Sequence, residues 1–146
     1  MRAYEYRHVV GLEETNLLGN VYYVNHLRWQ GRCREMFLRD NAPEVLTEVS
    51  QGLSLVTTRV SCEYLGELSA FDEVVIRMRL REVVLNRVSM IFEYWRKIGE
   101  IEELIARGEQ QVACVRKDGK RILPAPIPNA LQKAIRSFVT EQNGSG

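Results

Sequence analysis

The segment Tyr22 to Asp40 constrains the fold most, because it combines helical periodicity with an unusually wide apolar face. At about 100° per residue, its polar side chains gather in one narrow arc. This arc contains Asn25, Arg28, Arg32, Glu35 and Arg39. The remaining arc contains Tyr23, Val24, Leu27, Trp29, Cys33, Met36, Phe37 and Leu38. A helix with so much apolar surface is predicted to lie inside the fold, wrapped by other elements.

Arg34 departs from this pattern, because it lies in the apolar arc, one heptad after Leu27 and one turn before Leu38. An arginine that points toward a core is rare unless it is paired or used. Two interpretations follow. Arg34 is either a functional cation or one partner of a buried ion pair with a strand carboxylate such as Glu63.

Segments with strand periodicity precede and follow this helix in the sequence. Alternation of apolar with polar residues predicts strands at 4–10, 53–65, 73–86, 88–96 and 103–116. Because these strands are long, have one apolar face and are joined by short turns, they predict a five-stranded antiparallel sheet covered on one side. The proline-rich segment 123–128 predicts irregular structure, and the apolar residues from Leu131 to Val139 predict a C-terminal helix. We expect one α+β domain at 1–140 and a disordered tail at 141–146.

The composition limits the classes of protein to which the chain can belong. The chain has 146 residues and a net charge of +1, so a second domain and an electrostatic footprint for nucleic acid are not expected. Three separated cysteines and two histidines indicate neither a disulfide framework nor a metal site, and no cofactor is predicted. No apolar run approaches the roughly 18–20 residues of a membrane span, and the N-terminus has no signal-peptide core. We therefore expect a cytoplasmic protein.

The stretch from Glu14 to Trp29 resembles the entry-loop motif of hot-dog acyl thioesterases of the 4-hydroxybenzoyl-CoA type. In that motif an acidic residue lies three positions before a glycine, and an asparagine lies six positions after it. Gly19 and Asn25 match the motif, but Asn16 stands at the acidic position. The resemblance implies the hot-dog fold, in which such a sheet wraps around one long helix. It also implies a different mechanism here, because the carboxylate is the family's usual nucleophile or base.

A wider pattern is similar to the thioesterases that accompany enediyne polyketide synthases. It comprises the segments 7–10, 13–17, 29–35, 70–73 and 106–108. That subgroup also carries asparagine for the acid, although it has tyrosine where this chain has His26. Its members release long, unsaturated 3-oxoacyl chains from the acyl-carrier domain of the synthase, and the 3-oxo acid can decarboxylate to a methyl ketone polyene. The resemblance implies homodimers, often assembled into homotetramers, with each active site between two subunits.

The residue pattern and the resemblance together predict the site residues. The predicted catalytic groups are Asn16, Arg34 and the backbone amide of Tyr23. The predicted substrate contacts are Leu17, Leu18, Gly19, Tyr22, Asn25, His26 and Glu63. Because asparagine does not readily form an acyl-enzyme, we expect direct attack by water, with donors that stabilise the oxyanion. Asn16 would orient either the carbonyl through its NH₂ group or the water through its own oxygen.

The sequence also leaves other catalytic groups open. Glu13, Glu14 and Glu63 are alternative water-activating bases, and the sequence does not identify the base. A nucleophilic pair of His26 and Cys33 is disfavoured, because two helical turns place these side chains roughly 10 Å apart. A basic stripe could meet an acidic carrier domain, but a solvated or inter-subunit face is the commoner explanation. This stripe consists of Arg77, Arg79 and Arg81.

The sequence leaves three alternatives to the enediyne function. A general acyl-CoA thioesterase would not depend on a carrier protein. A non-catalytic hot-dog protein would bind an acyl thioester without hydrolysing it, with Asn16 marking the lost reaction. A hot-dog dehydratase is less favoured, because the usual Asp/His pair for proton transfer is absent.

Overall fold

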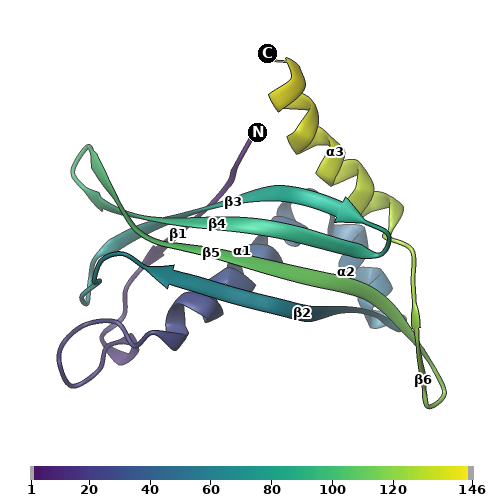
Figure 1. Cartoon of the computed structure of the whole chain (residues 1–146), viewed down its shortest axis with the longest axis horizontal. Coiled ribbons are helices and arrows are strands. Elements are labelled where there is room, and N and C mark those ends of the chain that lie inside the picture. Colours follow the sequence, from purple (N-terminus) through teal and green to yellow (C-terminus); the bar gives the residue numbers. More distant parts are fainter. Residues whose placement is uncertain (1, 145–146) are drawn as a thin grey trace.

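The computed structural model describes residues 2–144, and side chains as far as residue 138. A curved antiparallel sheet has the helices on one of its faces (Figure 1). The elements in chain order are β1 (Tyr4–Val9), η1 (Leu12–Glu14), α1 (Val24–Asn41), α2 (Pro43–Ser50), β2 (Leu53–Tyr64), β3 (Glu73–Val84), β4 (Arg87–Ile98), β5 (Ile101–Asp118), β6 (Arg121–Pro124) and α3 (Asn129–Gly144). The strand order is β1-β3-β4-β5-β2, with β6 paired to β5. The predicted α+β hot-dog fold is confirmed.

The sheet has six strands rather than the predicted five. The additional strand is β6, which pairs with the end of β5 through a turn at Gly119, whose φ is +64°. The prediction of irregular structure was therefore wrong at Leu123 and Pro124. Proline is tolerated at the end of a short edge strand, because its missing N–H need not enter the ladder. The helix α2, with Pro43 in its first turn, was also not predicted.

The core lies between α1 and the inner face of the sheet. Trp29, Cys33 and Phe37 of α1 are buried, as are Phe92 and Tyr94 of β4. Two parts of the predicted helical pattern were wrong. Asn25 is buried although it was assigned to the solvent arc, and Tyr23 and Val24 are exposed although they were assigned to the core. All three lie at the start of α1, where the preceding loop replaces the sheet as the neighbour of the helix.

Cross-strand ion pairs neutralise the predicted basic stripe on β3. Arg77 Nη1 lies 2.7 Å from Glu102 Oε2, and Arg81 Nη1 lies 2.9 Å from Glu109 Oε1. Arg79 also pairs with a carboxylate, that of Glu93 on β4. Such partly exposed pairs contribute about 0–1 kcal/mol each. The stripe is therefore not a free basic surface in this chain.

Two strands form the edges of the main sheet. β1 and β2 are the edge strands of this order, and most residues of β2 are exposed.

The backbone of α3 extends through residue 144, while residues 145 and 146 lie outside the described residues. The disordered tail at 141–146 and the domain boundary at 140 therefore remain predictions. In the described part of the chain, every helix is too short or too polar to cross a membrane.

Candidate active site

The loop before α1 forms a tight turn around Asn16. The side-chain oxygen of Asn16 accepts a hydrogen bond from the Leu18 amide at 2.9 Å, and its backbone carbonyl accepts one from the Gly19 amide at 3.0 Å. Gly19 has a φ of +90°, which a residue with a Cβ rarely adopts. Asparagine side chains commonly bond to the backbone two residues on in such turns. The turn therefore fixes which way the amide of Asn16 points.

Glu14 attaches this loop to the rest of the fold. Its carboxylate accepts hydrogen bonds from Trp29 Nε1 at 2.7 Å, His8 Nε2 at 2.7 Å and the Gly11 amide at 2.8 Å. Its backbone carbonyl accepts a further bond, 2.8 Å long, from Asn25 Nδ2. Burial alone would raise the pKa of Glu14, but these three donors lower it. The carboxylate is thus ionised and committed to structure, which argues against Glu14 as the base.

A cavity of about 260 Å³ lies between this loop, the start of α1 and the segment that follows β2. It is lined by Asn16, Asn20, Val21, Tyr23, His26, Tyr64, Gly66, Glu67 and Leu68. Three residues predicted from the sequence, Asn16, Tyr23 and His26, therefore meet at one cavity. Tyr64 and Glu67 were not predicted, because no motif in the sequence indicates which end of β2 faces the loop.

Two hydrogen-bond donors at this cavity are uncommitted. The Asn16 oxygen is already occupied by the Leu18 amide, whereas among residues 2–144 its Nδ2 has no acceptor. The backbone N–H of Tyr23 also has no acceptor in that range, and the Tyr23 carbonyl accepts a 2.7 Å bond from the Tyr64 hydroxyl. Preorganised N–H groups beside a cavity can stabilise negative charge on a carbonyl oxygen. Of the two orientations considered for Asn16, the turn leaves the NH₂ group free for a ligand.

His26 forms the inner wall of this cavity. Only 3% of the residue is exposed, and its ring packs against Tyr64, Trp29 and Tyr94 with centroid distances of 4.7, 5.2 and 5.6 Å. Neither ring nitrogen has a hydrogen-bond partner within the described chain. Burial lowers the pKa of His26 to about 4, and the nearby Tyr23 carbonyl offsets this only in part. His26 is therefore a neutral imidazole at neutral pH.

Arg34 lies away from the cavity, eight residues and about 12 Å along α1 from His26. Its Nη1 donates to Gln110 Oε1 at 2.8 Å and to Thr57 Oγ1 at 3.1 Å. No carboxylate of the described residues forms an ion pair with it, so the alternative pairing with Glu63 is absent there. Burial lowers the pKa of Arg34, yet guanidinium stays charged in proteins. Arg34 is thus a half-buried cation held by two neutral acceptors.

The other predicted contacts do not line the cavity. Leu17, Leu18 and Tyr22 are exposed on the loop, and the Asn25 amide is bonded to the Glu14 carbonyl. Glu63 lies on β2, in register with Arg107 of β5. Their roles as substrate contacts remain predictions.

Cys33 is fully buried. Burial raises the pKa of its thiol to about 12, so almost none of it is thiolate at neutral pH. The thiolate is the nucleophilic form of cysteine. A covalent mechanism through Cys33 is therefore disfavoured by its surroundings as well as by its spacing from His26.

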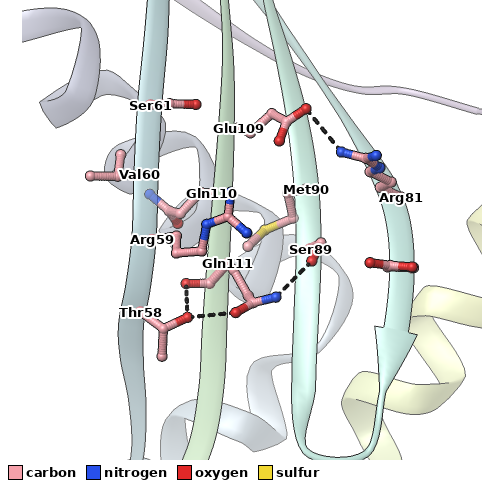
Figure 2. A pocket seen from close by; sticks show the side chains of 11 residues that line it. Thr58, Arg59, Val60, Ser61, Arg81, Ser89, Met90, Glu109, Gln110 and Gln111 are labelled. Carbon is pink, nitrogen blue, oxygen red and sulfur yellow. Dashed lines mark hydrogen bonds and ion pairs between the residues drawn. The ribbon is translucent and has the colours of Figure 1, made fainter.

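A second hollow, of about 570 Å³, lies over β2, β5, β4 and β3. Figure 2 shows Gln111 bonded to Thr58 and Ser89, and Glu109 bonded to Arg81, in front of the strands, with the helices behind them. Gln110 is buried instead and accepts a hydrogen bond from Arg34 of α1. None of the predicted catalytic residues lines this hollow.

Residues 10–135 match the family model described as the thioesterase-like superfamily. A solved structure of the dynemicin thioesterase, studied for polyene binding, is 43% identical, with 93% of this chain and 96% of that chain covered and a TM-score of 0.90. No curated protein matches the sequence.

Two more distant structures support the fold alone. A 4-hydroxybenzoyl-CoA thioesterase, with an aspartate-to-asparagine substitution and its 4-hydroxybenzoyl-CoA ligand, is 17% identical, covers 92% of this chain and 99% of that chain, and has a TM-score of 0.82. A 1,4-dihydroxy-2-naphthoyl-CoA thioesterase from Synechocystis is 19% identical, covers 94% and 98%, and has a TM-score of 0.77.

Proposed function

Because the chain belongs to the thioesterase-like superfamily, we propose that it hydrolyses a polyunsaturated 3-oxoacyl thioester on the acyl-carrier domain of an enediyne polyketide synthase. The products are the carrier thiol and a 3-oxo acid, which decarboxylates to a methyl ketone polyene. The observation that carries the proposal is the 43% identity to the dynemicin thioesterase over 93% of this chain.

The chemistry of the cavity is compatible with this reaction. A thioester carbonyl is electrophilic, so the main requirement is stabilisation of the oxyanion that forms when water attacks. The Asn16 NH₂ group and the Tyr23 N–H are the donors that we assign to this oxygen. The exposed loop residues Leu17, Leu18 and Tyr22, together with Gly19, would contact the acyl chain or its carrier arm.

We extend the proposal to a homodimer, and a homotetramer built from two dimers. The support comes from β2, an edge strand that exposes 43% of Val56 and 45% of Val60. Exposed edges with apolar side chains favour pairing with another chain. Pairing along β2 would bury Arg34 beside the partner, because Arg34 already contacts Thr57 of this strand. Its charge would then act on a substrate bound between subunits. Light scattering coupled to size exclusion measures the assembly.

The function is tested by thiol release from a medium-chain 3-oxoacyl thioester and its saturated counterpart, each presented on a carrier protein and on coenzyme A. We expect fast release only from the carrier-bound 3-oxo substrate. Equal rates for all four would instead indicate a general acyl thioesterase. Release from none, with substrate binding retained, would identify a non-catalytic acyl-binding protein.

A further inference from the structure

His26 is buried and polar, yet it lacks the partner that such a group normally has. A neutral imidazole has one N–H donor and one nitrogen acceptor, and buried polar groups in folded proteins are nearly always hydrogen-bonded. In the described chain neither nitrogen of His26 makes a hydrogen bond, although the Tyr23 carbonyl lies near the ring, and the ring lines the cavity that also contains Asn16. Leaving such a group unsatisfied is energetically unfavourable. Its position therefore suggests a role toward a molecule in the cavity.

The neighbours of the ring hold it in place without satisfying it. Trp29, Tyr64 and Tyr94 surround the imidazole at centroid distances of 4.7 to 5.6 Å. Both tyrosine hydroxyls are committed elsewhere, since Tyr64 donates to the Tyr23 carbonyl at 2.7 Å and Tyr94 donates to the His26 carbonyl at 2.6 Å. Burial raises the pKa of both tyrosines, so they are neutral at neutral pH. The imidazole is thus fixed in orientation and has a nitrogen left for a ligand.

The other titratable groups near the site are poorly suited to accept a proton. The Glu14 carboxylate already accepts three hydrogen bonds, and Arg34 has no acceptor atom. The amide of Asn16 is not a base. Glu67 also lines the cavity, but it is exposed to solvent. Among the residues that line the cavity, His26 is therefore the one proton acceptor that is both buried and fixed in place.

We propose that His26 is the proton acceptor that activates the hydrolytic water, taking the role that Asn16 cannot perform. The inference rests on the proposed thioesterase function. One nitrogen of His26 removes a proton from water while the water oxygen forms a bond to the thioester carbon. The carbonyl electron pair moves to oxygen, where Asn16 and the Tyr23 N–H stabilise the charge. The C–S bond then breaks, the electron pair leaves with sulfur, and the imidazolium returns its proton to the thiolate. Water and thioester thus become acid and thiol.

The burial of His26 permits this proton transfer. In the free protein, burial lowers the pKa of His26 to about 4, which keeps the nitrogen unprotonated and available at neutral pH. When the oxyanion forms nearby, its negative charge favours the imidazolium, because opposite charges interact strongly at low dielectric. Positioned general bases contribute about 10² to 10⁴-fold in rate.

The test compares wild type with His26→Ala in the thiol-release assay, with and without added imidazole and with hydroxylamine as an alternative nucleophile. We expect the kcat for hydrolysis to fall at least about 10²-fold, with a smaller change in KM. Imidazole can enter the vacated space and should restore part of the rate. Thiol release to hydroxylamine should fall much less, because this nucleophile does not need deprotonation.

Two further variants keep the result interpretable. His26→Gln retains hydrogen bonding and a similar size without a usable base, and it should remain folded but slow. Glu67→Gln removes the other carboxylate at the cavity and should lose less activity than His26→Gln. Hydrolysis by His26→Ala at a near wild-type rate, equal losses with water and hydroxylamine, or a loss in Glu67→Gln as large as that in His26→Gln would each overturn the role of His26. Absence of thiol release by wild type would instead refute the proposed function, and this inference with it.

Discussion

Replacing Glu14 with alanine should destabilise the chain strongly, because it removes one acceptor that serves three donors. The Trp29 indole is 3% exposed and cannot recruit water, so its lost bond costs about 1–3 kcal/mol. His8 and the Gly11 amide are only partly buried and can be rehydrated, so we assign about 0.5–1 kcal/mol to each. The expected loss in the free energy of unfolding is therefore about 2–5 kcal/mol.

The assay is urea unfolding at pH 7, with the adjacent Glu13→Ala as the matched control. Glu13 is exposed, so its removal should change stability by less than about 0.5 kcal/mol. Glu14→Gln keeps an acceptor oxygen and should lose less than Glu14→Ala. Because Glu14 also attaches the loop that carries Asn16, thiol release should slow in Glu14→Gln even where the protein is folded. A destabilisation by Glu14→Ala below about 1 kcal/mol would show that the three hydrogen bonds to Glu14 contribute little to stability.

Three other perturbations follow from the structure. Gly108→Ala would place a Cβ 2.8 Å from the Ser61 carbonyl and against the Gln30 amide, so the midpoint of urea unfolding should fall by the equivalent of about 1–3 kcal/mol; an unchanged midpoint would contradict this packing. Cys33→Ala should keep kcat within a few-fold in steady-state thiol release, and complete loss in a folded variant would revive covalent catalysis. The pKa of His26 is about 4 when folded and about 6.5 when unfolded, so below pH 6.5 the unfolded chain binds more protons. Wild-type stability should therefore decline by about 2 kcal/mol between pH 7 and pH 5, and the same pH dependence in His26→Phe would show that another group is responsible.

The periodicities of the sequence predicted the architecture well, because helix and strand periods differ and each long element keeps its period throughout. The failures are local. β6 and α2 are too short to produce a periodic pattern, and Asn25 is buried by a loop rather than by the sheet. A helical wheel assumes one environment along the whole helix, which does not hold at the start of α1.

The sequence could indicate only in part which of the predicted site residues lie together, for a related reason. The wheel indicates on which face a residue lies, but not which strand lies opposite it at each turn. His26 and Arg34 lie eight residues apart on α1, yet only His26 meets the cavity at Asn16. Tyr64 reaches the same cavity because of the pairing of β2 with β5, which is interrupted by a bulge between Thr57 and Arg59. That register depends on contacts distant in sequence, which a motif does not contain.

The proposed mechanism requires that the thioester is hydrolysed in the cavity at Asn16. The decisive measurement is the kcat of Asn16→Ala on a carrier-bound 3-oxoacyl thioester, beside Asn41→Ala as a control in which the same side chain is removed at the far end of α1. We predict that loss of the Asn16 donor lowers kcat by about 10²-fold, with Asn41→Ala unchanged. A folded Asn16→Ala variant with near wild-type kcat would contradict the claim and move the reaction to another part of the molecule.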